Sequence, residues 1–300
     1  MVDRLKGKVC VATGSGQGIG RGIALAMAKE GAAVVTNNRF RGTPGGDAET
    51  TAREIMDAGG QAVSFFGDVS ESEVCHKLIQ AAVDNFGRLD ILVNNAGVGV
   101  GGTVWNATEE AFNIAVDSHL RGTFNCIRYA LELMKEQRWG RIINCTSNSW
   151  LGTPGLCVYS AVKAGIVGLT RSVACDVIEH GITCDAYHPF AATGLVPSRE
   201  SPLVTRGGVD VIRRRYELGL IDKEEYEWQT HPPPPEGVGP FIAYLATDEA
   251  AYINGRVFYA SGGKVAIYSE PVREKTILKK EGLWTVEELI EQVPNALLKA

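Results

Sequence analysis

Val9-Cys-Val-Ala-Thr13-Gly14-Ser-Gly-Gln-Gly18-Ile-Gly20 is the stretch that decides the fold. An apolar run ends at Thr13 and breaks into a glycine-rich turn, and the apolar spacing of a helix follows from Ile23 to Glu30. Glycines let a backbone approach a diphosphate, and the helix N-terminus offers it unpaired N–H groups and a positive dipole end. A tight turn also needs glycines, but the order strand, glycine turn and helix favours nucleotide binding.

The glycine turn indicates where a dinucleotide's phosphates would bind. The candidate cofactor-binding residues in it are Gly14, Ser15, Gln17, Gly18, Ile19 and Gly20. The next strand, Ala33–Thr36, ends where the adenosine ribose should lie. An acidic residue there would bond a free 2′-hydroxyl, whereas an arginine would accept a 2′-phosphate. Asn38 and Arg39 therefore favour NADP, with NAD as the alternative, although Arg39 could also be a solvated loop residue.

Strands and helices keep alternating along the chain. Apolar patterns predict strands at 62–66, 89–93, 141–147, 182–187 and 256–259. They predict helices at 48–58, at 109–137 and at 239–247, and a further helix that ends at residue 86. Such alternation indicates a parallel sheet covered by helices on both faces and joined by right-handed crossovers. The predicted fold class is therefore α/β, a Rossmann-like doubly wound parallel sheet.

Further candidates for the nucleotide site follow the third and fourth strands. Asp68 could bind the adenine amine, or it could start the helix before the capping pattern Ser70-Glu-Ser-Glu73. Small residues after the fourth strand would let a ligand pass close to the backbone. The candidates in these two places are Asp68, Val69, Asn95, Ala96 and Gly97.

Tyr159-Ser-Ala-Val-Lys163 is the stretch where chemistry is expected. Residues four apart share one face of a helix, so the phenol and the ammonium would be neighbours. A nearby cation favours the phenolate and lowers the pKa of a phenol from its usual value near ~10, which would suit Tyr159 to general acid–base catalysis. Ser147 ends a buried strand, where open parallel sheets bind ligands. The alternative is an ordinary surface pair.

Length and composition predict one domain with appendages. A chain of 300 residues, 45% of them hydrophobic, can form a large single core. We assign residues 1–263 to the catalytic domain and 264–300 to a C-terminal extension. Within the domain, the irregular insertion 196–236 predicts a substrate lid, or else a surface excursion. Thr285-Val-Glu-Glu288 is a capping pattern that predicts a short helix in the extension.

Composition also excludes several classes of function. A net charge of −5 and a pI near 5.7 argue against nucleic-acid binding, and Arg213–Arg215 is interpreted as a solvated helix face. Seven cysteines without a CxxC pair predict free thiols and no metal site. The N-terminus has no signal-peptide pattern, and no apolar run approaches the ~18 residues of a membrane span. We therefore expect a cytoplasmic protein.

Taken together, the motifs resemble those of the short-chain dehydrogenases/reductases over about residues 5 to 263. The matching motifs are Thr13-Gly14-xxx-Gly18-x-Gly20, Asn94-Asn-Ala-Gly97, Ser147 and Tyr159-xxx-Lys163. The resemblance implies that Ser147 and Tyr159 hydrogen-bond the reacting oxygen. It further implies that Lys163 holds the nicotinamide ribose and acidifies the tyrosine. Thr193, with Pro189 in the same loop, would bind the nicotinamide end of the cofactor.

Two positions depart from the family's pattern. His119 stands where the family usually has an asparagine that holds a water linking the lysine to solvent. This imidazole, expected to be mostly neutral beside Lys163, could carry protons as a fourth catalytic residue or could merely fill space. Phe190 stands where a glycine commonly follows Pro189, and a bulky ring there should reshape the nicotinamide end of the pocket.

Within the family, one branch looks nearest: the dehydrogenase portion of peroxisomal multifunctional enzyme type 2 and bacterial relatives that oxidise 3-hydroxyacyl-CoA thioesters. The motifs that resemble it are Ser118-His-Leu-Arg-Gly-Thr-Phe124, Asn254-Gly-Arg-Val-Phe258, Gly262-Gly263 and Trp284-Thr-Val-Glu-Glu288. The resemblance implies an NAD(P)-dependent oxidoreductase that interconverts a secondary alcohol and a ketone, and a homo-oligomer built on the long helices. A 3-hydroxyacyl-CoA-like thioester is one candidate substrate.

Two other interpretations stay open. Trp150, Tyr187, His188 and Phe190 would suit a roomy pocket for a bulky cyclic or steroidal alcohol, unless they belong to the core. The second interpretation belongs to another class of function: a regulatory protein that binds a dinucleotide but catalyses no redox reaction. The presence of Ser147, Tyr159 and Lys163 disfavours it.

Overall fold

The computed structural model describes residues 3–193 and 208–298. In this part of the chain the strands form one eight-stranded sheet in the order β3-β2-β1-β4-β5-β6-β7-β8. Strands β1 to β7 pair in parallel, and β8 returns antiparallel to β7. The strands are Val9–Ala12 (β1), Ala33–Asn38 (β2), Ala62–Phe66 (β3), Ile91–Asn94 (β4), Gly140–Cys145 (β5), Ile182–Pro189 (β6), Val257–Ser261 (β7) and Lys264–Ile267 (β8).

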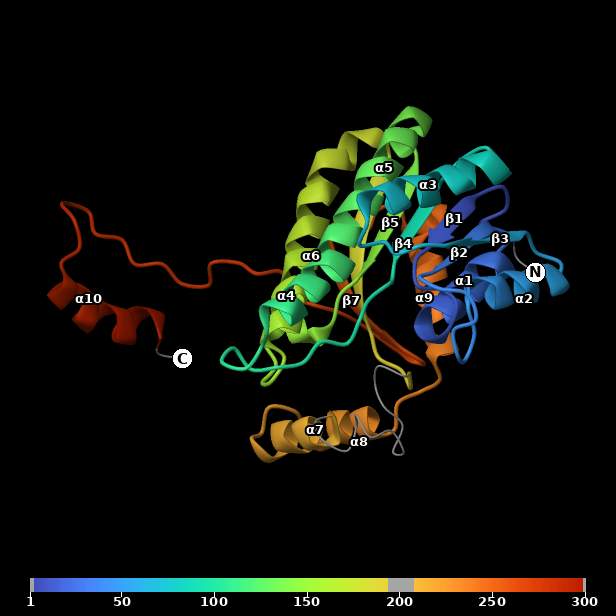
Figure 1. Cartoon of the computed structure of the whole chain (residues 1–300). Coiled ribbons are helices and arrows are strands. Elements are labelled where there is room, and N and C mark those ends of the chain that lie inside the picture. The colour runs from blue at the N-terminus through green and yellow to red at the C-terminus, as the bar shows by residue number, and fades with distance from the viewer. Residues whose placement is uncertain (1–2, 194–207, 299–300) are drawn as a thin grey trace. The chain divides into compact units, whose positions relative to one another are not determined.

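Helices cover both faces of the sheet (Figure 1). One face packs against α1 (Gly18–Lys29), α2 (Ala48–Asp57) and α9 (Gly239–Leu245). The other packs against α3 (Ser72–Phe86), α5 (Gly122–Gln137) and α6 (Cys157–Val177). The predicted doubly wound parallel sheet is confirmed.

Side chains along each central strand alternate between two cores. On β1, Cys10 and Ala12 lie in the core under α1 and α9, whereas Val9 and Val11 lie in the core under α3 and α5. Both faces exclude water, which is why these strands are apolar throughout instead of alternating with polar residues. The strand order reverses at β1, which has β2 on one side and β4 on the other. A crevice for ligands forms at such a reversal, at the carboxyl ends of the strands.

The helix expected over 109–137 is continuous but not uniform. It consists of α4 (Glu109–Ala115), a π-helical turn at Val116–Arg121, and α5. The π turn contains His119, and π turns are frequent at functional sites.

Two local expectations need correction. The capping pattern predicted at Ser70–Glu73 is wrong, because α3 begins after Glu71, whose side chain makes no capping bond. The segment 196–236 was expected to be irregular, yet its described part holds α7 (Gly208–Glu217) and α8 (Lys223–Thr230).

The chain divides into two compact units, residues 1–267 and 268–300. The first unit runs past Gly263 because β8 adds a strand to the sheet. The second contains α10 (Val286–Gln292), which opens with the predicted capping box between Thr285 and Glu288. Among the helices described, none combines the length and the apolar character needed to cross a membrane.

A buried carboxylate ties β1 to β4 at the end of the strands opposite the crevice. Asp90 is fully buried, and its Oδ2 accepts the N–H of Val9 at 2.9 Å. The guanidinium of Arg88 donates to both carboxylate oxygens, at 2.7 and 2.8 Å. Removing the carboxylate would leave a buried N–H and a cation without their acceptor.

We predict that Asp90→Ala lowers the free energy of unfolding by about 3 kcal/mol, measured by urea denaturation. The matched control is Glu73→Ala, which breaks an exposed ion pair with Lys77 (3.5 Å) and should cost less than ~0.5 kcal/mol. Equal losses in the two variants would show that Asp90 does not tie the strands together.

Candidate active site

Thr13 joins the loops that follow β1 and β4. Its hydroxyl oxygen accepts the N–H groups of Asn95 and Ala96, both at 2.9 Å. In return, the Asn95 amide donates to the carbonyls of Thr13 and Gly14, at 3.2 and 3.1 Å. A Cβ on Gly14 would lie 2.8 Å from the Cα of Ala96, so the two loops meet closely only because residue 14 is glycine. These contacts close the base of the crevice at the strand reversal.

A tyrosine from β6 holds the other side of Asn95. The hydroxyl of Tyr187 donates to Asn95 Oδ1 at 3.0 Å, and the tyrosine is fully buried. Burial raises the pKa of Tyr187 well above its usual value. The pocket-wall interpretation of Tyr187 is therefore wrong, since the ring belongs to the core. Asn94 is also structural, because its amide donates to Asn144 Oδ1 at 2.9 Å.

Close packing and backbone conformation make glycine necessary at several positions of the glycine turn. The Ser15 hydroxyl is used inside the turn, where it donates to the carbonyl of Ala12 at 2.7 Å. A Cβ on Gly20 would lie 2.2 Å from the carbonyl oxygen of Gly14. Gly18 has φ +57 and is open except towards Thr193, the residue expected at the nicotinamide end.

The start of α1 leaves its N–H groups to a ligand. Gln17 at the N-cap makes no side-chain capping bond, and the first turn of α1 carries no acidic side chain. Anions bind favourably at such a helix end. This N-terminus and the glycine cradle together fit the diphosphate of a dinucleotide.

An ion pair occupies the place expected for the adenosine. Arg39 pairs with Asp68 at 2.5 Å, and Asp68 also accepts the N–H of Ser70 at 2.9 Å. The Asn38 side-chain oxygen is buried against Gly16 and has no hydrogen-bond partner among the described residues. Val69, a further candidate, places its side chain in the core.

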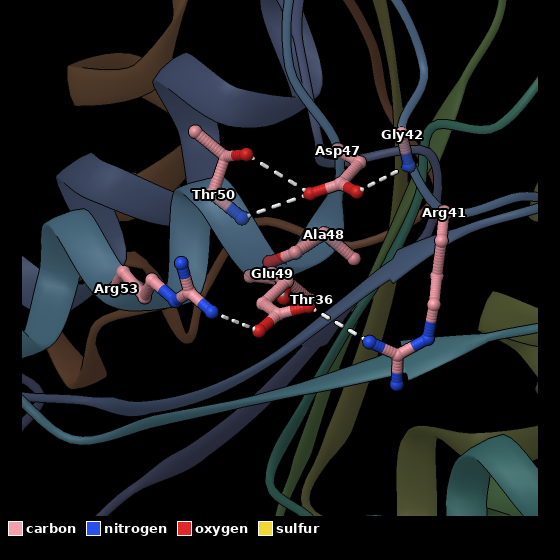
Figure 2. Close-up of polar contacts among 8 residues, drawn as sticks. All are labelled: Thr36, Arg41, Gly42, Asp47, Ala48, Glu49, Thr50 and Arg53. Atoms are coloured by element: carbon pink, nitrogen blue, oxygen red, sulfur yellow. Dashed lines mark hydrogen bonds and ion pairs between the residues drawn. The ribbon is translucent and has the colours of Figure 1, made fainter.

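The loop after β2 folds against the glycine turn, since a Cβ on Gly46 would lie 2.7 Å from the carbonyl oxygen of Gly16. Figure 2 shows the polar contacts within the loop and the start of α2. Asp47 caps α2 by accepting the N–H of Thr50 at 2.9 Å, and it also accepts the N–H of Gly42 at 2.7 Å. These bonds lower the pKa of Asp47. On the inner side, the Thr51 hydroxyl donates to the carbonyl of Gly16 at 3.2 Å.

Sequence analysis singled out Arg39 in this loop but missed Asp47. The signal was present, since an aspartate directly before a helix is a common cap. Arg41, on the outer side of the loop, pairs with Glu49 at 2.8 Å (Figure 2).

The end of β5 holds the turn of α6 that carries Lys163. The Lys163 ammonium is buried and donates to the carbonyl of Cys145 at 2.8 Å. The Thr146 hydroxyl donates to the Lys163 carbonyl at 2.9 Å. The ammonium lies 5.5 Å from the centre of the Tyr159 ring, on the helix face that the spacing predicted.

Ser147 follows Thr146 directly and caps a short 3-10 turn, Asn148–Leu151, that packs on α6. Its hydroxyl oxygen accepts the N–H of Ser149 at 3.3 Å. Ser147, Tyr159 and Lys163 thus belong to one local assembly of β5, this turn and α6.

Two buried histidines flank Lys163. His119 is 3% exposed, and His188, at the end of β6, is 5% exposed. Burial, with the charge of Lys163 as the second cause, lowers the pKa of each imidazole to about 3. Both rings are therefore neutral near pH 7. The sequence singled out His119 for chemistry and placed His188 only in the pocket wall.

Helix α8 of the insertion is anchored to the edge of the sheet. Trp228 of α8 donates to the Tyr259 hydroxyl at 2.7 Å, and the Tyr259 ring meets His188 edge-on at 5.0 Å. Glu225 of α8 pairs with Lys264 of β8 at 2.8 Å. Arg199 and Arg206 of the insertion, cations that could bind the phosphates of a coenzyme A thioester, lie outside the described residues.

The loop after β6 is bound to β7. Pro189 pairs with Ala260, and the Phe190 N–H donates to the Ala260 carbonyl at 3.1 Å. The Ser261 hydroxyl donates to the Phe190 carbonyl at 2.5 Å. The backbone at Phe190 is thus held by the sheet.

Comparisons with known proteins agree with this architecture. A family model described as short chain dehydrogenase matches residues 8–199. A crystal structure of a short chain dehydrogenase from Mycobacterium avium superposes with a TM-score of 0.80 at 33% identity, covering 99% of this chain and 96% of that one.

Curated relatives include enzymes whose names refer to acyl groups on acyl carrier protein or coenzyme A. A 3-oxoacyl-[acyl-carrier-protein] reductase of Synechocystis sp. is 34% identical over 264 residues, 87% of this chain and 98% of that protein. The (2S)-[(R)-hydroxy(phenyl)methyl]succinyl-CoA dehydrogenase subunit BbsD of Thauera aromatica is 30% identical, over 87% of this chain and 97% of that protein. Peroxisomal multifunctional enzyme type 2 of Drosophila melanogaster is 39% identical over 65% of this chain but only 34% of its own length. The chain therefore belongs to the short chain dehydrogenase family, whose members are NAD(P)-binding oxidoreductases acting on CH–OH groups.

Proposed function

We propose that this enzyme interconverts the 3-hydroxy and 3-oxo forms of an acyl thioester, with NADP(H) as its cofactor. The observation that carries the proposal is the assembly of Ser147, Tyr159 and Lys163 at the end of β5, beside the crevice where the glycine turn lies. The thioester is favoured because two relatives that match nearly their whole length bear names of acyl groups on carrier protein or coenzyme A.

Each of the three residues has a distinct task in this reaction. The Tyr159 hydroxyl exchanges a proton with the reacting oxygen, and the Ser147 hydroxyl donates a hydrogen bond to the same oxygen. Lys163, held by the Cys145 carbonyl, has further N–H donors to offer the ribose of the cofactor. When bound, the nicotinamide supplies or accepts the hydride. The protein contributes placement and electrostatics.

The preference for NADP rests on Arg39. Its guanidinium is nearly half exposed at the end of β2, and Asp68 is its partner in the ion pair. A 2′-phosphate carries more negative charge than one carboxylate, so it can take over this guanidinium while Asp68 keeps its bond from Ser70. A ribose with a free 2′-hydroxyl gains little from an arginine already paired.

The proposal includes self-association in the cytoplasm. Phe112 on α4 and Phe124 on α5 are 48% and 49% exposed, on the long helix expected to contact a second copy. Large apolar side chains left exposed on one helix favour an interface. All seven cysteines are free thiols, which suits a reducing compartment.

We predict that Tyr159→Phe lowers kcat/KM by about 10³-fold on a 3-oxoacyl-CoA, because the variant has no proton to exchange. NADPH affinity, measured by fluorescence titration, should stay within about twofold, because proton exchange at the phenol contributes to catalysis and not to cofactor binding. The control Tyr252→Phe changes a tyrosine that is 80% exposed and should retain full activity. Retained turnover in Tyr159→Phe would remove the tyrosine from the mechanism.

Cofactor preference gives a second prediction. Arg39→Ala should weaken NADPH binding by about 10- to 100-fold, since a bond between two charged groups contributes roughly 1.5–3 kcal/mol, and should leave NADH binding nearly unchanged. Arg53→Ala, an exposed arginine paired with Glu49, is the control. Wild-type enzyme that binds NADH more tightly than NADPH would contradict the assignment.

A further inference from the structure

His119 contacts both halves of the proposed site. Its Nε2 lies 2.8 Å from the carbonyl oxygen and 3.1 Å from the nitrogen of Val98. Its ring meets the Tyr159 ring edge-on, with centres 5.4 Å apart and planes at 82°. Val98 continues the segment expected to line the cofactor's path, and Tyr159 is the proposed acid–base group. One buried side chain therefore touches both.

The ring also requires a glycine beside it. A Cβ built on Gly97 would lie 2.3 Å from Cε1 and 2.8 Å from Nδ1 of His119. Real side chains do not approach so closely, so His119 occupies the space that any larger residue at 97 would need. The imidazole thus sets how near the backbone at Gly97 can come to α5 and α6.

The hydrogen bonds define one state of the ring. A single nitrogen cannot donate to the Val98 carbonyl and accept from the Val98 N–H at the same time. The shorter contact favours a proton on Nε2, donated to the carbonyl. Nδ1 then carries a lone pair, and it is buried without a hydrogen-bond partner among the residues that the structure describes. Because the ring is neutral, it adds no second positive charge next to Lys163.

We propose that His119 is a positioning residue that acts in two directions: Nε2 holds the Gly97–Val98 segment for the cofactor, and the ring edge holds Tyr159 for proton exchange. This inference rests on the proposed function. The sequence left two roles open for His119, carrying protons and filling space. Neither applies here, because His119 transfers no proton and makes two specific contacts. Substitutions that keep one contact and lose the other should separate the two effects.

His119→Asn keeps groups that can bond both the N–H and the carbonyl of Val98 but removes the ring. We expect kcat to fall about 10-fold, as a misplaced catalytic group does, while the NADPH dissociation constant stays within about twofold. His119→Phe keeps a ring and leaves the Val98 carbonyl without its donor. NADPH affinity should then weaken about 5- to 10-fold, the cost of one lost hydrogen bond, with a smaller loss in kcat.

The controls guard against trivial explanations. His76→Asn changes an exposed histidine on α3 and should alter neither quantity. NADPH binding is measured without substrate, and kcat is measured on the best substrate of the wild-type enzyme. If the wild-type enzyme does not turn over acyl thioesters, the proposed function is wrong, but the role of His119 can still be tested on another substrate. If His119→Phe fails to fold, His119→Gln, which also lacks the ring, should behave like His119→Asn.

A double-mutant cycle tests the contact with Gly97 directly. Gly97→Ala should cost at least 10-fold in kcat/KM in the wild type and clearly less in His119→Asn, where the clashing ring is gone. The pH profile of kcat/KM should keep its shape in His119→Asn, because a neutral ring contributes no ionisation. Equal costs in both backgrounds, a changed profile, or parallel losses of kcat and NADPH affinity in His119→Asn and His119→Phe would each overturn the proposal.

Discussion

The hydroxyl of Thr13 is the contact on which the crevice depends. It accepts two backbone N–H groups from the loop after β4, and the side chain of Asn95 in that loop donates back to the turn after β1. In a parallel sheet, the loops on either side of the strand reversal tend to diverge, and this divergence opens the ligand site. The bonds of Thr13 limit the opening at its base. Tyr187 extends the same network to β6.

Electrostatics in the candidate site follow from burying one cation. Lys163 is 2% exposed, and the backbone carbonyl of Cys145 accepts a hydrogen bond from its ammonium group. Neighbours that could become positive are neutral instead, since burial and the lysine's charge lower the pKa of both His119 and His188. A charge that is buried away from water acts more strongly on its neighbours than it would in water.

The elements around the crevice are attached by contacts of their own. The loop before α2 is tied down by the Asp47 cap, and α8 of the insertion is tied to β7 and β8 through Trp228 and Glu225. The strand β8 thus supports a helix of the insertion as well as extending the sheet. In the described part of the second unit, residues 268–298, no side chain is fully buried, so that unit has no core of its own.

The sequence by itself determined the order of strands and helices outside the insertion and up to β7, the glycine turn, and the face shared by Tyr159 and Lys163. These features depend on residues a few positions apart, whose spacing is read directly from the periods of helix and strand. Only the tertiary structure decided that Tyr187 belongs to the core, that Asp68 pairs with Arg39, and that His119 meets Val98 and Gly97. Each of these contacts joins residues at least 21 positions apart, and the longest, Tyr187 to Asn95, joins residues 92 apart. Their geometry follows from the packing of helices on the sheet, to which no local pattern of residues corresponds.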